Sequence, residues 1–102
     1  MGRNTKPRIM FKTNEYYDGR VKSIAFSSGQ RKATVGVMAP GEYEFNTQSA
    51  EQMKVVTGEM YVKLEGDSEY KIFKSGERFF IKENSKFNVK VEVETSYLCL
   101  YE

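Results

Sequence analysis

The stretch PGEYEFNTQSAEQMKVVTGEM, residues 40–60, decides how this protein folds. It opens with a Pro-Gly pair, which favours a turn, and continues at 42–45 as alternating acidic and aromatic residues. Alternation with a period of two is typical of a strand that has one solvated face. The polar residues Thr47, Ser49 and Glu51 follow, ahead of another segment rich in Val. The stretch therefore predicts two strands joined by a polar loop.

The same alternation continues through the rest of the chain. Residues 59–65 place Met60, Val62 and Leu64 on one face, and residues 87–94 place four apolar residues on one face. Further strands are expected at Val21–Ser27, Lys32–Met38, Gln52–Thr57, Tyr70–Phe73, Arg78–Lys82 and Ser96–Tyr101. Many short strands at this spacing predict an all-β sandwich or closed barrel. The one helical feature expected is a short turn at 49–53.

Length and composition indicate a single small domain. The chain has 102 residues, which fits one domain, and we expect a flexible N-terminal arm at 1–13 followed by a β-barrel at 14–102. The net charge of +2 is too small to indicate a nucleic-acid or membrane partner. A single cysteine, Cys99, excludes an intrachain disulfide and favours a cytoplasmic location. The first residues have no apolar segment, so a secretory signal is not expected.

The chain contains no histidine. This removes the usual general acid and base, the usual catalytic triads and the usual ligands of zinc, iron or copper. Any chemistry must then use carboxylates, hydroxyls, lysine, arginine, the thiol or backbone groups. Glu51 by itself cannot form a transition-metal site, so no metal and no organic cofactor are expected.

The spacing in the opening stretch resembles the first sequence motif of the cupins. Gly41 and Gly58 bracket it, and Thr47 and Ser49 stand where cupins usually carry histidines. A less complete second motif begins at Gly76 and ends with Phe87 at the place of a histidine. The resemblance implies a single-domain cupin fold, a small jelly-roll-like β-barrel, that has lost its metal.

A closer resemblance covers residues 14–102. The segments NEYYDGRVKSIAFSS, TVGVMAPGEYEF, MKVVTGEM and TSYLCLYE are similar to the small cupin-type pyrimidine/purine nucleoside phosphorylases of bacteria. The turn at 82–84 departs from the Pro-Gly that this family can carry there. The resemblance implies a pentosyltransferase, which splits purine and pyrimidine nucleosides with inorganic phosphate into a free base and a pentose 1-phosphate. It implies no metal or organic cofactor, and cupins commonly form homodimers.

Cleavage of a glycosidic bond passes through a sugar cation, which carboxylates and phosphate can stabilise without histidine. Glu51 is the first choice for the catalytic carboxylate that binds ribose, with Thr47 and Ser49 as further substrate-binding groups. The alternative is a solvated polar loop. An apolar wall for the base is expected from some of the aromatic residues, although core packing is the usual role of each. These candidates are Tyr43, Phe45, Phe80, Phe87 and Tyr97.

For phosphate, the segment FSSGQRK offers hydroxyls at Ser27 and Ser28 and a charge at Lys32, unless it is merely a solvated hairpin turn. Arg78 is a further phosphate-binding candidate if its strand face points into the barrel, and an exterior charge if it does not. Tyr61 and Tyr101 are candidates for a dimer interface.

Two other functions remain open. A metal-free cupin can bind a small ligand without catalysis, and a small barrel with surface tyrosines can bind single-stranded nucleic acid. The small net charge and the scattered aromatic residues argue against the second.

Overall fold

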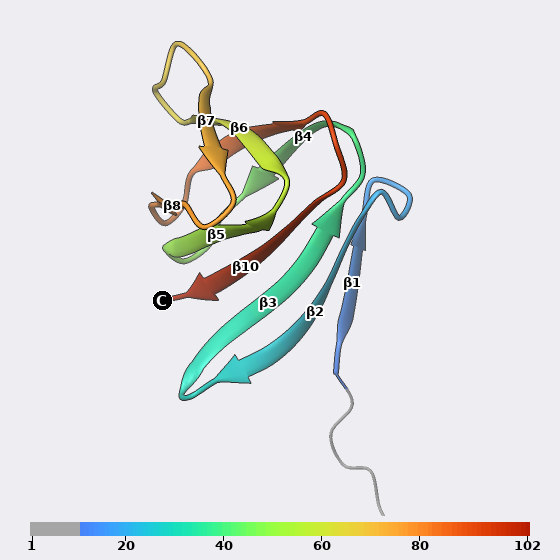
Figure 1. Cartoon of the computed structure of the whole chain (residues 1–102). Helices are drawn as coiled ribbons and strands as arrows, with labels where there is room; N and C mark the ends of the chain where they lie inside the picture. The colour runs from blue at the N-terminus through green and yellow to red at the C-terminus, as the bar shows by residue number, and fades with distance from the viewer. Residues whose placement is uncertain (1–10) are drawn as a thin grey trace, which may run out of the picture.

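Ten strands form two antiparallel sheets in residues 11–102, the part of the chain that the computed structural model describes (Figure 1). The strands are β1 (Thr13–Tyr16), β2 (Val21–Ser28), β3 (Arg31–Met38), β4 (Gly41–Asn46), β5 (Glu51–Thr57), β6 (Glu59–Leu64), β7 (Lys71–Lys74), β8 (Arg78–Ile81), β9 (Lys86–Val91) and β10 (Thr95–Tyr101). Within these residues no helix is long and apolar enough to span a membrane. The predicted all-β fold is confirmed.

The larger sheet has six strands in the order β1-β2-β3-β10-β5-β8, and the smaller has four in the order β4-β9-β6-β7. We call them the large and the small sheet. The C-terminal strand β10 lies between β3 and β5, so it is central to the large sheet although it comes last in the chain. The two sheets pack face to face, and the chain crosses repeatedly between them, as in a jelly roll.

The core lies between the sheets and follows from the alternation in the sequence. Met60 and Val62 of β6 and Val89 and Val91 of β9 are fully or almost fully buried on the inner face of the small sheet. They pack in one cluster with residues of the large sheet such as Val55. The prediction that alternate residues of 59–65 and 87–91 face the core is confirmed.

Three expectations about local structure need correction. Residues 49–53 do not form a helical turn, because Glu51 begins β5 and pairs with Ile81 of β8. Val93, predicted on the apolar face of residues 87–94, is 53% exposed because β9 ends at Val91. A further strand, β1, begins at Thr13, so the last residue of the predicted arm belongs to the large sheet; the rest of the arm lies largely outside the described residues.

Two contacts tie the sheets together at their ends. The turn between β1 and β2 places Tyr17 and Asp18 at φ values of 55° and 58°, in the left-handed region that few side chains adopt. The Tyr17 hydroxyl donates to the carbonyl of Glu44 at 2.5 Å and accepts from its backbone N–H at 3.0 Å. Elsewhere, the buried Thr47 hydroxyl donates to the Lys82 carbonyl at 2.8 Å. Both contacts join β4, or the residue just after it, to a loop at the end of a large-sheet strand.

Candidate functional site

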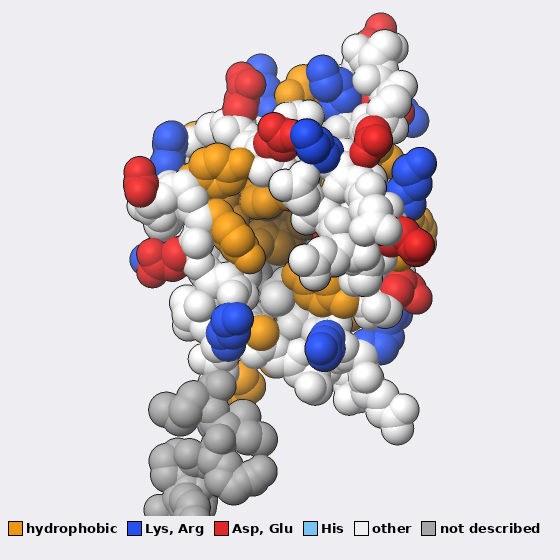
Figure 2. Space-filling view, turned by 180° about the vertical axis from the view of Figure 1, so that it is seen from behind, with side chains coloured by type: hydrophobic (Ala, Val, Ile, Leu, Met, Phe, Trp, Pro, Cys, Tyr) orange, Lys and Arg blue, Asp and Glu red, His pale blue; other side chains and the backbone are white. Residues whose placement is uncertain are grey.

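A cavity of about 630 Å³ lies between the inner face of the large sheet and strand β4 with the loop that follows it. This volume is within the range that holds small organic ligands. The molecular face in Figure 2 is hollowed, with hydrophobic side chains inside the hollow and charged ones around it. The cavity is lined by Tyr16, Tyr17, Ser23, Thr34, Met38, Glu44, Phe45, Asn46, Gln48, Ser49, Glu51, Met53, Phe87, Tyr97, Cys99 and Tyr101.

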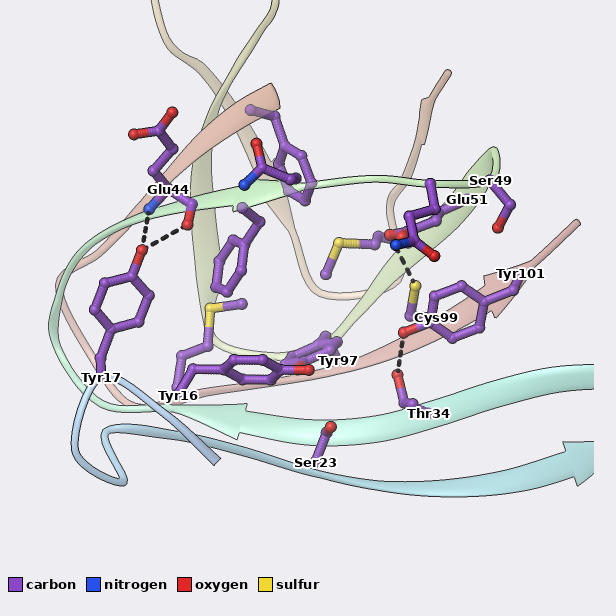
Figure 3. A pocket seen from close by; sticks show the side chains of 16 residues that line it. Tyr16, Tyr17, Ser23, Thr34, Glu44, Ser49, Glu51, Tyr97, Cys99 and Tyr101 are labelled. Carbon is purple, nitrogen blue, oxygen red and sulfur yellow. Dashed lines mark hydrogen bonds between the residues drawn. The ribbon is translucent and has the colours of Figure 1, made fainter. Parts of the chain in front are cut away.

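One end of the cavity is polar and carries the carboxylate of Glu51. Glu51 starts β5, and its neighbour across the sheet is β10, which supplies Cys99 and Tyr101. The Cys99 thiol donates a hydrogen bond to Oε1 of Glu51 at 3.3 Å. The hydroxyls of Tyr101 and Thr34 lie 3.2 Å apart. These four side chains line the same end of the cavity, and Ser49 lies beside Glu51 (Figure 3). The arrangement offers one acid and several hydroxyls to a ligand.

Burial shifts the acid–base properties of this end. It raises the pKa of the Glu51 carboxyl, and the hydrogen bond from Cys99 opposes that shift only in part. Burial also raises the pKa of the Cys99 thiol, and the nearby Glu51 carboxylate adds to the effect. A buried carboxyl is less stable in its charged form because the surrounding protein solvates charge poorly. Glu51 therefore holds a proton to higher pH than an exposed glutamate, whereas Cys99 stays a neutral thiol.

The other end of the cavity is aromatic. The rings of Tyr16 and Phe45 meet edge to face with centroids 6.2 Å apart, and those of Phe45 and Phe87 lie 5.6 Å apart. Tyr17 contacts Phe45 from the β1–β2 turn, with centroids 6.1 Å apart. Tyr16 and Tyr17 are 45% and 46% exposed, so part of this wall faces solvent. Flat apolar walls of this kind suit a planar heterocyclic ring.

Tyr97 forms the floor between the two ends. It is buried, and its ring lies directly over the backbone of β3 at Gly36. A Cβ atom at position 36 would come within 2.6 Å of the Tyr97 hydroxyl oxygen and 2.7 Å of the Lys22 carbonyl oxygen. Glycine at this position is therefore what lets the tyrosine ring approach the sheet.

The structure brings four of the predicted site residues into the cavity. Glu51, Ser49, Phe87 and Tyr97 all line it, together with Phe45. Glu51, Phe87 and Tyr97 lie on inward positions of strands β5, β9 and β10, whereas Ser49 lies in the loop before β5. Their roles toward a substrate remain predictions.

Four other predicted site residues do not line the cavity. Thr47 is buried and holds the turn before β9, accepting from the Ser85 backbone N–H at 3.0 Å. Tyr43 is 3% exposed and donates to the Ala39 carbonyl at 2.5 Å. Phe80 and Arg78 are exposed, because Phe79 and Ile81 occupy the inward positions of β8. Of the two alternatives for Arg78, the exterior charge is the one that the strand register favours.

The other predicted phosphate ligands, Ser27, Ser28 and Lys32, lie near the tip of the β2–β3 hairpin, just beyond the polar end. Ser27 pairs with Lys32, and the next inward pair, Ala25 with Thr34, reaches the cavity wall. Because side chains alternate along a strand, Ser27 and Lys32 share the inner face with Thr34. Ser28 pairs with Arg31 on the opposite face. A shallow groove that includes Lys32 also reaches Tyr101, which lines the cavity as well.

Several lining residues were not predicted from the sequence, and Tyr101 was expected at an interface instead. Tyr97, Cys99 and Tyr101 alternate in the sequence, so placing Tyr97 inside should have placed the other two there as well. Thr34 follows in the same way from its pairing with Cys99. Tyr16 and Tyr17 gave no such signal, because β1 was not expected as a strand. Among residues 11–102, no three metal-ligating side chains gather closely enough to hold a metal ion.

Solved structures of other proteins are similar to this chain in sequence and in fold. A solved structure from Vibrio parahaemolyticus, described as of unknown function, is 42% identical with a TM-score of 0.89, over 92% of this chain and 100% of that one. A Shewanella frigidimarina RmlC-like cupin has a TM-score of 0.71 over 96% of this chain and 86% of its own. It is 17% identical and supports the fold alone. The predicted cupin fold is confirmed.

Relatives of this chain carry the name pyrimidine/purine nucleoside phosphorylase, two of which are described here. The one from Pseudomonas syringae pv. tomato is 54% identical over 92 residues, which is 90% of this chain and 99% of the relative. The one from Alcanivorax borkumensis is 52% identical over 90% of this chain and 98% of its own length. The family model described as pyrimidine/purine nucleoside phosphorylase matches residues 11–101. The chain therefore belongs to the pyrimidine/purine nucleoside phosphorylase family.

Proposed function

We propose that this protein catalyses the phosphorolysis of purine and pyrimidine nucleosides to a free base and a pentose 1-phosphate. The observation that carries the proposal is the division of one cavity into an aromatic end and a polar end that holds the Glu51 carboxyl. A nucleoside has the same division, with a flat base at one end and a hydroxylated sugar at the other. The family name of the relatives points to the same substrates.

In the proposed complex the base lies against Phe45 and Phe87, and the ribose lies beside Glu51. The carboxyl accepts hydrogen bonds from ribose hydroxyls, and Ser49 adds a hydroxyl from the loop. Contacts with rings depend on shape rather than on the pattern of donors and acceptors on the base. A wall of this kind accepts both a purine and a pyrimidine, which suits a broad substrate range.

Phosphate enters at the polar end, between the hydroxyls of Thr34 and Tyr101 and the ammonium group of Lys32. A phosphate oxygen forms a bond to the anomeric carbon, the glycosidic C–N bond breaks, and its electron pair goes to the base. The protein's main tasks are then to position two substrates and to stabilise the sugar cation between them. Among the described residues, Lys32 forms no ion pair, so its charge is available to the anion.

The binding-module alternative also draws on an observation. None of the described residues that line the cavity is a lysine or an arginine, although phosphate sites usually have a cation. Under this alternative the cavity holds a neutral ligand and catalyses nothing. The two functions differ in whether nucleoside is consumed.

The decisive experiment separates uridine and inosine from their bases by chromatography after incubation with the purified protein. We expect free base only when inorganic phosphate is present, and an equal yield with a chelator. Base released without phosphate would make the protein a hydrolase. No base from either nucleoside would favour the binding module, and ligand binding would then be measured by calorimetry.

Lys32→Ala tests the phosphate end, with Lys71→Ala on the exposed strand β7 as a control of equal charge change. We expect the KM for phosphate to rise about tenfold in the first variant, the usual effect of losing one charge-assisted hydrogen bond. The KM for the nucleoside should change little. Equal behaviour of the two variants would exclude Lys32 from the phosphate site.

We further propose a homodimer that acts in the cytoplasm, where the single thiol stays reduced. A nucleic acid or a membrane remains unexpected as a partner, given the small net charge.

A further inference from the structure

The mouth of the cavity lies between two segments of the chain. Most of the residues that line the cavity are buried or half-buried, and the exposed ones lie only on the turn that follows β1 and on β4 with the loop after it. These exposed lining residues are Tyr16, Tyr17, Glu44, Asn46 and Gln48. β1 is the last strand at one edge of the large sheet, and β4 is the last strand at one edge of the small sheet. The cavity therefore opens to solvent between these two edges.

Tyr17 spans this mouth. Its hydroxyl reaches from the β1–β2 turn to the backbone of Glu44, where it donates to the carbonyl at 2.5 Å and accepts from the N–H at 3.0 Å (Figure 3). A strand at the edge of a sheet presents such groups without a strand partner, and here a side chain takes the partner's place. The Tyr17 ring also contacts Tyr43 and Phe45 of β4, at centroid distances of 5.1 and 6.1 Å. One side chain therefore links the two rims of the mouth.

The turn that carries Tyr17 has an unfavourable backbone conformation. Tyr17 and Asp18 have φ values of 55° and 58°, and Gly19 follows at 84°. Of the three, only glycine adopts this left-handed region without a steric cost. Adjacent side chains in such a conformation persist where the surrounding contacts hold them, and they cluster at ligand sites. The contacts between Tyr17 and β4 offset this strain at the mouth of the cavity.

We propose that Tyr17 is a positioning residue for the nucleobase: its bonds to Glu44 hold the adjacent Phe45 at the distance that a single-ring base requires. Phe45 follows Glu44 in β4 and belongs to the aromatic wall. Contact energy falls steeply with separation, by about a quarter to a half for a gap of about 0.5–1 Å. A pyrimidine has one ring and depends on a close wall, whereas the second ring of a purine keeps contact in a wider mouth. The inference rests on the proposed function, because it takes nucleosides as the ligands.

The link across the mouth is tested first without a substrate. Hydrogen exchange followed by NMR reports on the amide of Glu44, whose N–H donates to the Tyr17 hydroxyl. Tyr17→Phe keeps the ring and removes the hydroxyl, so exchange at Glu44 should accelerate by about tenfold, the size expected for a lost hydrogen bond. Tyr70→Phe is the matched control, because Tyr70 lies between β6 and β7 and does not line the cavity. It should leave the exchange rate unchanged. Unchanged exchange in Tyr17→Phe would overturn the proposal.

The selection of the base is tested by the kinetics of the same variants with uridine and inosine in the presence of phosphate. We expect Tyr17→Phe to lower kcat/KM for uridine by about tenfold, mainly through KM, and that for inosine by no more than about threefold. Tyr70→Phe should change neither value. A general loss of stability lowers the active fraction equally for both nucleosides, so it leaves their ratio unchanged. Equal losses for the two nucleosides, or no loss for either, would overturn the role of Tyr17 in base selection.

The proposed reaction and the role of Tyr17 fail in different ways. If the native protein cleaves neither nucleoside, the reaction is wrong, whereas the exchange rate of the Glu44 amide still shows whether Tyr17 holds β4. Dissociation constants for uridine and inosine, measured by calorimetry, then replace the rates in the comparison. A larger loss of affinity for uridine than for inosine in Tyr17→Phe would support the proposal. Equal losses, or a native protein that binds neither nucleoside, would overturn it.

Discussion

The small and large sheets alternate with the same period, but around the cavity the large sheet reverses the polarity of the two faces. The small sheet points Met60, Val62 and Val89 inward and Lys63, Asn88 and Lys90 outward, the last three being half-buried. Around the cavity the large sheet points Ser23, Thr34 and Glu51 inward, and it points Ile24, Val35 and Val37 outward. Polar inward residues are stable only where hydroxyls pair with one another or face a ligand or water. The reversal therefore marks a cavity on one face of the large sheet and exposed apolar side chains on the other.

The largest expected effect comes from breaking the apolar face of the small sheet. Met60 is fully buried in the core, and Met60→Ala should lower the free energy of unfolding by about 2–5 kcal/mol, because the core cannot fully close around the lost side chain. Thr34→Val keeps the volume of the side chain on the inner face of the large sheet but removes its hydrogen bond with Tyr101, so it should lower the free energy of unfolding by only about 0.5–1.5 kcal/mol, the net contribution of one hydrogen bond. Urea unfolding measures both. Equal losses would mean that the two inner faces contribute alike to stability.

Glu51→Gln tests the polar inner face of the large sheet. The substitution should lower activity, whereas it should raise stability relative to the native protein as the pH rises. We expect kcat/KM for uridine to fall by about a hundredfold, as for other losses of a group that stabilises the transition state. Burial raises the pKa of Glu51, so the folded state binds this proton more tightly than the unfolded state. That stabilisation is complete below the ordinary pKa of a glutamate and is lost as the pH rises through the raised value.

The amide side chain of the Glu51→Gln variant cannot ionise, so the stability of this variant relative to the native protein should increase as the pH rises across that window. Melting temperatures at acidic and neutral pH measure the difference. A variant that became relatively less stable at neutral pH would show that the carboxylate is stabilised by contacts that outweigh its burial.

Gly36→Ala tests the close contact between the Tyr97 ring and the large sheet. The added methyl group would overlap the tyrosine hydroxyl and the Lys22 carbonyl, so we expect a loss of about 1–3 kcal/mol in unfolding free energy. Displacing Tyr97 should also raise the KM for nucleosides. An unchanged melting temperature together with an unchanged KM would mean that the floor of the cavity tolerates a shift of this ring.

The smallest expected effect compares two adjacent serines. Ser27 shares the inner face with Lys32, whereas Ser28 shares the outer face with Arg31. If phosphate binds at the polar end, Ser27→Ala should raise the KM for phosphate by about twofold to tenfold, the range for one neutral hydrogen bond. Ser28→Ala should leave it unchanged. The reverse result would place the anion on the other face of the hairpin.

Much of the fold could be predicted from local patterns, because a strand with one wet face shows its alternation directly in the sequence. This held for β6 and β9, and turn residues marked most strand ends. It failed for β1, whose short polar sequence pairs with β2 but shows no apolar alternation. It also failed at Phe80, an aromatic residue that is 66% exposed where burial would be the ordinary expectation.

The sequence by itself determined the all-β class, the family and the absence of histidine from any site, since these depend only on residue type and order. It also singled out Glu51, through its place in the opening stretch. Only the tertiary structure decided which aromatic and hydroxyl groups meet that carboxyl. Their meeting depends on β10 pairing between β3 and β5, which aligns Cys99 with Thr34 on one side and with Met53 on the other. Pairing between strands far apart in the sequence leaves no local pattern, so the face that each residue presents is settled only when the sheets close.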